Sequence, residues 1–228
     1  MQTLLEFVNH LMNPDWIMAN GGLFLVLFII FAETGLLFGF FLPGDTLLFI
    51  TGMMIAGVKD NPYPFDSGPM NLVFWITLII IAAILGNFTG YWLGRKSGGY
   101  LLSRKDSWIF KKKHLTTARE FYEKKGGIAI ILARFLPILR TFAPVVGGVV
   151  KMDFKKFTLY NITGAILWVS GIVTIGYLLG ENVWVQESLE YFIIGLILIT
   201  TAPVLMKMFL GKKKTNKISI AKKMGKVL

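Results

Sequence analysis

Two long uncharged segments constrain the fold of this chain more than any other feature. Residues 71–94 and 157–180 are each 24 residues long and contain no charged side chain. A third apolar segment, 191–210, is interrupted only by Lys207 near its end. About 20 apolar residues are enough for a helix to cross a bilayer. The sequence therefore predicts an all-α polytopic membrane protein.

The composition supports this class and excludes several kinds of site. Charged residues make up 16% of the chain, against roughly 25% in soluble domains. The chain does not open with a basic stretch followed by a short apolar run, so no cleaved signal peptide is predicted. There is no Cys, and the two His residues lie outside the apolar segments. We therefore expect neither a metal site nor another cofactor.

The distribution of charge predicts the orientation in the membrane. Ten basic residues lie in 95–125 and seven more in 212–226, whereas residues 1–58 contain no Lys or Arg. The segment 181–190 instead carries three acidic residues and no basic one. Because basic loops are retained in the cytoplasm, both basic segments are predicted to be cytoplasmic. Nucleic-acid binding is the weaker interpretation of the net charge of +11.

Two further apolar segments, 22–58 and 127–150, do not fit a single straight crossing. Each contains Pro residues, which remove a backbone donor and clash with the preceding helical turn. Both flanks of 127–150 are basic, so its two ends are expected on the same side of the membrane. We therefore predict two re-entrant helical hairpins, whose irregular backbone must be buried in protein or line a wet cavity. The residues expected to break these helices are Pro43, Gly44, Pro137 and Pro144.

Short repeated peptides predict that the two halves share one architecture. Phe-Leu-Pro occurs at 41–43 and at 135–137, and GYWLG at 90–94 resembles GYLLG at 176–180. Each half is predicted to contain a surface helix, a re-entrant hairpin and a transmembrane helix, in opposite orientations. Inverted repeats with broken helices are typical of secondary transporters. The expected single membrane domain, 1–210, comprises a first half (1–94), a basic interfacial segment (95–126), a second half (127–180) and a final transmembrane helix (191–210), followed by a basic tail (211–228).

Four ionisable residues lie inside the predicted hairpins: Glu33 and Asp45 in the first, Arg134 and Arg140 in the second. A charge at the bilayer centre costs roughly 3 kcal/mol or more, so it normally faces a partner or a cavity. If the hairpin tips meet, two carboxylates face two guanidiniums. These groups could form static salt bridges. Alternatively, the arginines could bind a phosphate in bidentate fashion while the carboxylates exchange protons.

Other polar and aromatic residues of these segments are expected to serve packing. Asn87 and Asn161 are predicted to form hydrogen bonds between helices, and Trp168 to pack or to anchor an interface. Asp45, which directly follows Pro43-Gly44, could also cap the half-helix that begins there.

Four motifs resemble the DedA family of bacterial membrane proteins, which is related to the eukaryotic VTT-domain lipid scramblases. They are FAETG, which contains Glu33, PGD at 43–45, GNFTGYWLGR at 86–95 and RFLPILRTFAPVVGG, which begins at Arg134. The resemblance covers roughly residues 20–185. It implies essential acids at Glu33 and Asp45 and essential arginines at Arg134 and Arg140. It also implies lipid translocation across the bacterial inner membrane, driven by the proton motive force.

The function expected from these features is translocation of a phosphate-bearing lipid, with undecaprenyl phosphate favoured. Arg134 and Arg140 would bind the phosphate, and Glu33 and Asp45 would handle protons. The expected partners are the anionic lipid, protons and bilayer lipids, with no nucleic acid, and a homo-oligomer is compatible with the sequence. The alternatives are a phosphatidylethanolamine-type flippase, an energy-independent scramblase or a non-transporting scaffold. A lipid phosphatase would need a metal cluster or a nucleophile with its base, so no enzymatic activity is expected.

Overall fold

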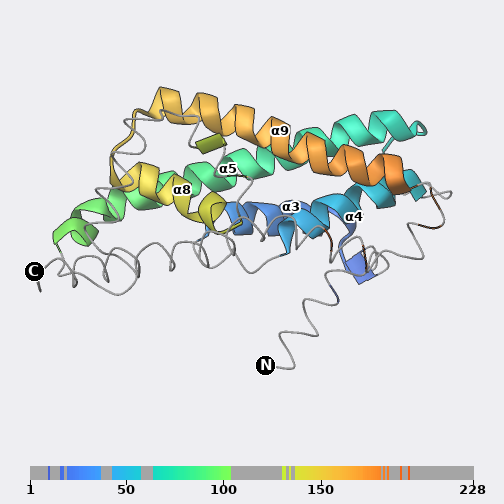
Figure 1. The fold of residues 1–228 in the computed structure, drawn as a ribbon, viewed down its shortest axis with the longest axis horizontal. Helices are drawn as coiled ribbons and strands as arrows, with labels where there is room; N and C mark the ends of the chain where they lie inside the picture. The colour runs from blue at the N-terminus through green and yellow to red at the C-terminus, as the bar shows by residue number, and fades with distance from the viewer. Residues whose placement is uncertain are drawn as a thin grey trace, which may run out of the picture.

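The computed structural model describes residues 20–36, 43–57, 64–103 and 137–180, together with positions 10, 16, 17, 130, 131, 134, 182, 184, 191 and 195. The helices in these residues are α3 (Gly22–Gly35), α4 (Gly44–Gly57), α5 (Gly68–Ser103), α8 (Pro137–Val149) and α9 (Phe154–Gly180) (Figure 1). The described residues contain no strand, which confirms the predicted all-α class. The segments 104–129 and 211–228, and most of the predicted helix 191–210, lie outside the described residues.

Within the described residues, α5 and α9 are the two helices long and apolar enough to cross a membrane, over 68–98 and 154–180. They run across the molecule as its longest elements, with the shorter helices beside them (Figure 1). Both predicted segments lie within these two helices, and both helices extend beyond them. The cap of α9 explains its early start, because Asp153 Oδ1 accepts the backbone N–H of Lys156 across 2.9 Å.

The first predicted helix break is present. Helix α3 ends at Gly35, and α4 begins at Gly44, directly after Pro43, whose carbonyl accepts the Leu47 N–H across 3.0 Å. Residues 37–42, the expected hairpin tip, lie outside the described residues. Each helix has 14 residues, which corresponds to about 21 Å. Neither helix is therefore long enough to cross the hydrocarbon core of roughly 30 Å on its own.

The second helix break differs from its prediction. Pro137 is the first residue of α8, where the missing N–H costs nothing. Pro144, which was also expected to break the helix, lies inside α8. Helix α8 continues through Pro144 and packs along α5, where Gly90 lies opposite the proline ring. Contacts with another helix therefore hold together a helix that sequence alone predicts to break.

A tight turn leads from α8 into α9. Lys151 adopts a positive φ of 54°, and the N–H of Met152 donates to the Gly147 carbonyl across 2.9 Å while that of Lys151 donates to Gly148 across 3.0 Å. These two bonds are a Schellman motif, which satisfies the last carbonyls of a helix. The turn places the start of α9 next to the end of α8.

The second helix of each broken segment packs on the long helix of the other half. Helix α4 packs along α9, and α8 packs along α5. The backbones approach closely at glycines in both contacts. A Cβ at Gly176 would overlap the Phe49 carbonyl oxygen, and a Cβ at Gly94 would overlap the Val145 carbonyl oxygen. Small residues permit such close approach between membrane helices. The helices of the two halves are therefore interlocked rather than laid side by side.

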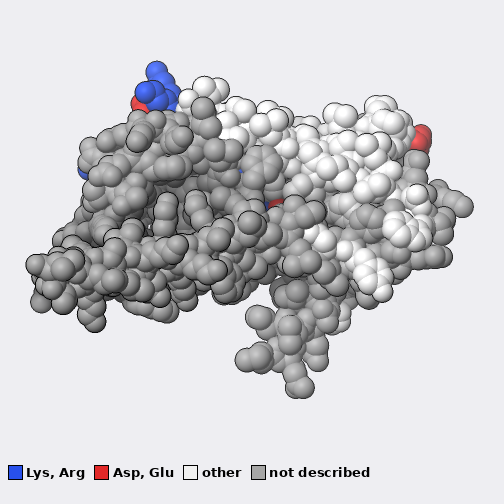
Figure 2. Space-filling model, in the orientation of Figure 1, with Lys and Arg blue, Asp and Glu red and all other residues white. Residues whose placement is uncertain are grey.

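The surface over the long helices is apolar. In Figure 2 the described surface over α9 is uncharged between its two ends, and basic side chains gather at the end where α9 begins. Large apolar side chains of α9, including Leu167 and Leu178, are 54% and 69% exposed. This distribution suits a helix surrounded by lipid.

Candidate functional site

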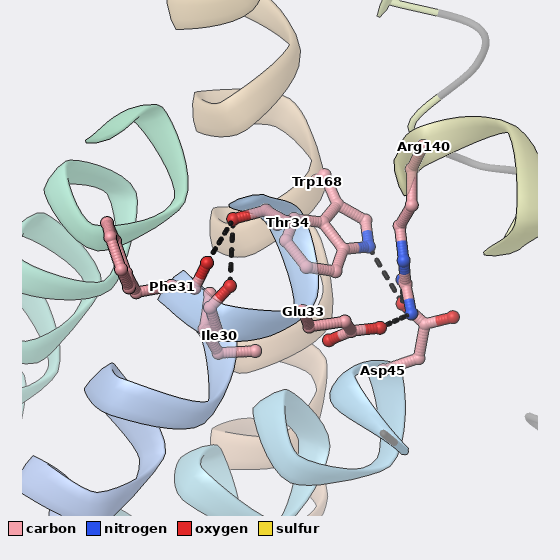
Figure 3. Close-up of polar contacts among 7 residues, drawn as sticks. All are labelled: Ile30, Phe31, Glu33, Thr34, Asp45, Arg140 and Trp168. Carbon is pink, nitrogen blue, oxygen red and sulfur yellow. Dashed lines mark hydrogen bonds and ion pairs between the residues drawn. The ribbon is translucent and has the colours of Figure 1, made fainter. Parts of the chain in front are cut away.

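A buried cluster of charged side chains lies where the broken helices meet. Arg140 of α8 forms an ion pair with Glu33 of α3 through Nη2 and with Asp45 of α4 through Nη1. The three residues are 4%, 0% and 9% exposed. Figure 3 shows their side chains converging from three different helices. The structure thus brings together three of the four charged residues predicted to form the site.

The ends of the helices position these charges. Glu33 lies in the last turn of α3, Asp45 is the second residue of α4, and Arg140 is the fourth residue of α8. Gly44 leaves room for this arrangement, because a Cβ at that position would overlap the Glu33 carboxylate. The carboxylate can therefore lie directly against the first turn of α4, where backbone N–H groups have no partner within the helix. Gly44 provides space as well as a helix break.

Trp168 also belongs to this cluster, although its sequence position predicted only a packing or interface-anchoring role. Its indole Nε1 donates to Asp45 Oδ1 across 2.9 Å, and its ring centroid lies 5.0 Å from the Arg140 guanidinium carbon. A guanidinium over a Trp face is stabilised by the ring quadrupole. The spacing of seven residues from Asn161 places both on one face of α9. Because Asn161 is polar, this spacing could have indicated that Trp168 faces a polar site rather than lipid.

Arg134 is buried beside the same ring but lacks a carboxylate partner among the described residues. It is 2% exposed, and its guanidinium carbon lies 5.9 Å from the centroid of the Trp168 ring. Nη2 donates to Asn161 Oδ1 across 2.5 Å, and Nε has no hydrogen-bond partner in the described part of the chain. Two carboxylates and two guanidiniums were expected to face each other. In the structure both carboxylates pair with Arg140, and neither pairs with Arg134.

Two asparagine amides connect Arg134 to α5 and α9. Asn161 links the two helices as predicted, because its Nδ2 donates to the Ile84 carbonyl of α5 across 3.3 Å. Asn87 Nδ2 donates to Asn161 Oδ1 across 2.8 Å in one orientation of its amide. In the opposite orientation, which satisfies more groups, Asn87 instead donates to the Thr34 carbonyl across 3.1 Å and accepts from Arg134 Nη2 across 2.8 Å. The sequence carries a further signal for this pair, which the prediction above did not use. Each asparagine begins an Asn-x-Thr-Gly motif, Asn-Phe-Thr-Gly at 87–90 and Asn-Ile-Thr-Gly at 161–164.

The distribution of charge defines what this site can do. The group of Glu33, Asp45 and Arg140 carries a formal net charge of one negative unit, and Arg134 carries one positive unit beside the same Trp168 ring. A buried guanidinium with an unused N–H is suited to binding an oxyanion, because its donors form parallel hydrogen bonds with carboxylate or phosphate oxygens. Protonating either acid would weaken its attraction to Arg140. The site therefore combines a guanidinium that lacks a carboxylate partner among the described residues with two titratable acids.

Similarity to known proteins agrees with this class of membrane protein. A VTT domain matches residues 42–178. Protein DedA of Escherichia coli (strain K12) is 37% identical over 92% of this chain and 94% of that protein. An uncharacterized membrane protein of Mycobacterium leprae (strain TN) is 35% identical over 90% of this chain and 87% of that protein. Inner membrane protein YqjA of E. coli (strain K12) is 34% identical over 75% of this chain and 73% of that protein. No solved structure matches.

The apolar helices and these relatives define a helical membrane protein. The chain belongs to the DedA family of VTT-domain proteins, which confirms the resemblance seen in its motifs.

Proposed function

We propose that this protein is a transporter that translocates a phosphate-bearing lipid across the bacterial inner membrane, in exchange with protons. The observation that carries the proposal is the state of Arg134, a buried cation with no carboxylate partner among the described residues. An uncompensated charge inside the membrane is costly and normally faces a partner or a substrate pathway. A lipid phosphate would supply the missing negative charge.

The two arginines form one phosphate-binding site in this proposal. Both guanidiniums lie against the Trp168 ring, at 5.9 Å for Arg134 and 5.0 Å for Arg140. A phosphate between them would accept hydrogen bonds from both forks. Undecaprenyl phosphate is favoured over a phospholipid such as phosphatidylethanolamine for a reason of charge. A phosphomonoester carries between about 1.5 and 2 negative charges near neutral pH, whereas the phosphate of phosphatidylethanolamine is accompanied by an ammonium.

Proton exchange is part of the proposal because Arg140 already pairs with two carboxylates. Glu33 and Asp45 both pair with it, so its Nη groups reach a phosphate only when these ion pairs loosen. Binding of a proton to one carboxylate removes its charge and releases one side of the guanidinium. Loss of that proton restores the ion pair and displaces the phosphate. Proton movement would thus be coupled to lipid binding and release.

The packing of the helices supports the proposed inverted repeat of two halves with re-entrant hairpins. Helix α4 lies on α9 as α8 lies on α5, and in each pair backbones touch at glycines. In transporters of this architecture, the site lies between repeats that move relative to each other. The basic segments 95–126 and 211–228 would face the cytoplasm, as the positive-inside rule requires.

Reconstitution of the purified protein into liposomes tests this function. The rate at which an undecaprenyl phosphate analogue crosses the bilayer would be measured with and without an imposed proton gradient. We expect Arg134→Gln, Arg140→Lys and Glu33→Gln to lower this rate strongly, while Lys155→Gln on the exposed start of α9 leaves it unchanged. Lysine is a demanding substitution at Arg140, since it keeps the charge but lacks the planar fork.

The same assay separates the alternatives. Transport by the three variants at the parental rate would refute the proposed site. Equal rates with and without a gradient would instead indicate an energy-independent scramblase, and a preference for phosphatidylethanolamine would identify a phospholipid flippase. Release of inorganic phosphate would indicate a lipid enzyme. Loss of folded protein in all three variants, with no transport by the parent, would indicate a scaffold.

A further inference from the structure

A groove of about 840 Å3 runs along α5 on the side of α3 away from the charge cluster. Phe31 of α3 forms part of its wall. In Figure 3 the Phe31 side chain points toward α5, whereas Glu33, two residues later, points toward Arg140. The groove and the charge cluster therefore lie on different faces of α3. Nothing in the proposed transport step accounts for this groove.

Most of the groove is apolar. Besides Phe31, its wall includes Leu85, Phe88 and Leu93 of α5, and the two leucines are 50% and 45% exposed. An acyl chain can pack against such a surface. Lipid tails are already in an apolar medium, so little is gained by moving one from the bilayer into the groove. Selectivity for a particular lipid must therefore come from the polar end of the groove.

That end carries two basic side chains, Arg95 and Lys96. Both are exposed, and neither forms an ion pair with a carboxylate in the described part of the chain. Arg95 is held in place, because Nη1 donates to the Tyr91 hydroxyl oxygen across 2.7 Å and its guanidinium carbon lies 5.9 Å from both the Tyr91 and the Trp92 ring. The remaining N–H groups of Arg95 are available to an anion.

Tyr91, which holds Arg95, is itself fixed. Its hydroxyl donates to the Met152 carbonyl across 2.6 Å, and its ring stacks on that of Phe157 at 4.5 Å. The position of Arg95 is thus set by a buried Tyr that two other parts of the chain hold in place. A positioned guanidinium loses less conformational entropy on binding a phosphate than a free side chain does.

The length of the groove matches one leaflet of a bilayer. Leu85 and Lys96 are both on α5, and their separation along the helix corresponds to about 16 Å. Half of a hydrocarbon core of roughly 30 Å has nearly the same depth. A lipid with its phosphate on Arg95 and Lys96 would therefore lay its acyl chain along the whole apolar wall.

We propose that this groove is a binding site for one anionic phospholipid, with the phosphate on Arg95 and Lys96 and an acyl chain against Phe31, Leu85 and Leu93. The site shares no residue with the charge cluster and does not depend on the proposed transport. Basic residues next to a membrane favour anionic lipids about fivefold each, so the occupant should be anionic rather than zwitterionic.

Photo-crosslinking from single cysteines tests the proposal, because the natural chain contains no Cys. Leu93→Cys would be labelled with a benzophenone maleimide in vesicles of phosphatidylcholine with a minority of phosphatidylglycerol. We expect the crosslinked lipid to be enriched in phosphatidylglycerol about fivefold or more over the vesicle composition. Leu167→Cys on the exposed side of α9, labelled in the same way, should report the vesicle composition itself.

Charge variants show whether the basic end causes the enrichment. Combining Leu93→Cys with Arg95→Gln and Lys96→Gln should return the crosslinked lipid to the vesicle composition, whereas Lys155→Gln with Lys156→Gln should preserve the enrichment. Lipid at the vesicle composition from Leu93→Cys in the parental background would overturn the proposal. So would a crosslink from that position to residues 191–210, because the chain itself would then occupy the groove.

Discussion

Trp168 donates a hydrogen bond from its indole nitrogen to Oδ1 of Asp45 across 2.9 Å, although α9 and α4 belong to different halves of the chain. The same carboxylate oxygen pairs with Arg140, whose guanidinium lies over the Trp168 ring. The indole therefore holds both members of an ion pair in one orientation. A residue that sequence alone assigns to packing is a structural part of the charge cluster.

Substitutions of Trp168 should separate its hydrogen bond from its ring. Trp168→Phe removes the N–H but keeps an aromatic face, and a lost hydrogen bond to a charged group costs about 2 kcal/mol. Trp168→Leu removes the face as well, which adds about 1 kcal/mol. We expect thermal stability in detergent and transport to fall in the order Trp, Phe, Leu. Trp184→Phe, at a position 65% exposed, is the matched control. Equal stability of the Phe and Leu variants would argue against a contribution from the ring.

Asn161→Asp should separate binding from stability. The new carboxylate would lie where Asn161 Oδ1 now accepts from Arg134, so it would neutralise that guanidinium internally. A buried ion pair with good geometry is roughly neutral for stability. We therefore expect a folded protein that no longer binds or moves a phosphate-bearing lipid, measured by thermal unfolding and by liposome transport. Transport at the parental rate would show that Arg134 does not bind the substrate.

Gly44→Ala should disrupt the cluster without adding or removing a charge. The new methyl group would overlap the Glu33 carboxylate and push it away from Arg140. Breaking a buried ion pair costs about 3 to 5 kcal/mol, so a marked loss of thermal stability is expected. Gly171→Ala is the control, since a Cβ there meets nothing within 4 Å. That change should be neutral or stabilise the helix by up to about 1 kcal/mol.

Two adjacent glycines of α8 provide an internal comparison for helix packing. A Cβ at Gly148 would overlap the Tyr91 carbonyl oxygen and lie 2.7 Å from the backbone nitrogen of Arg95. A Cβ at Gly147 would have no neighbour closer than 3.8 Å. Overpacking typically costs about 1 to 3 kcal/mol. Gly148→Ala should therefore lower the unfolding temperature in detergent, and Gly147→Ala should not. Similar unfolding temperatures for both would contradict the close packing of α8 on α5.

The sequence predicted those features that depend on the membrane as a solvent. The spans at 71–94 and 157–180 follow from their lack of charge, and α5 and α9 contain them. Burial of Glu33 and Arg140 in one cluster follows from the cost of an isolated charge in lipid. These inferences succeed because they require only the length and polarity of a segment.

Features that depend on contacts between distant segments were not predictable in the same way. Pro144 remains inside α8, which packs along α5, and no local pattern encodes that pairing of helices. The unequal sharing of acids between Arg140 and Arg134 likewise depends on which helix ends meet. The role of Trp168 was missed because an aromatic residue in an apolar span has packing as its ordinary interpretation.

The interlocked packing of the two halves has a consequence for biogenesis. Met53 of α4 contacts Gly180 at the end of α9, so the partner surface of α4 is synthesised only after most of the chain has been made. Until then α4 lacks its packing partner α9, and the carboxylates of Glu33 and Asp45 lack their ion-pair partner Arg140. A nascent chain that stops after α5 would contain two acids without their basic partner. Assembly of the second half would supply that partner and the packing surface of α4.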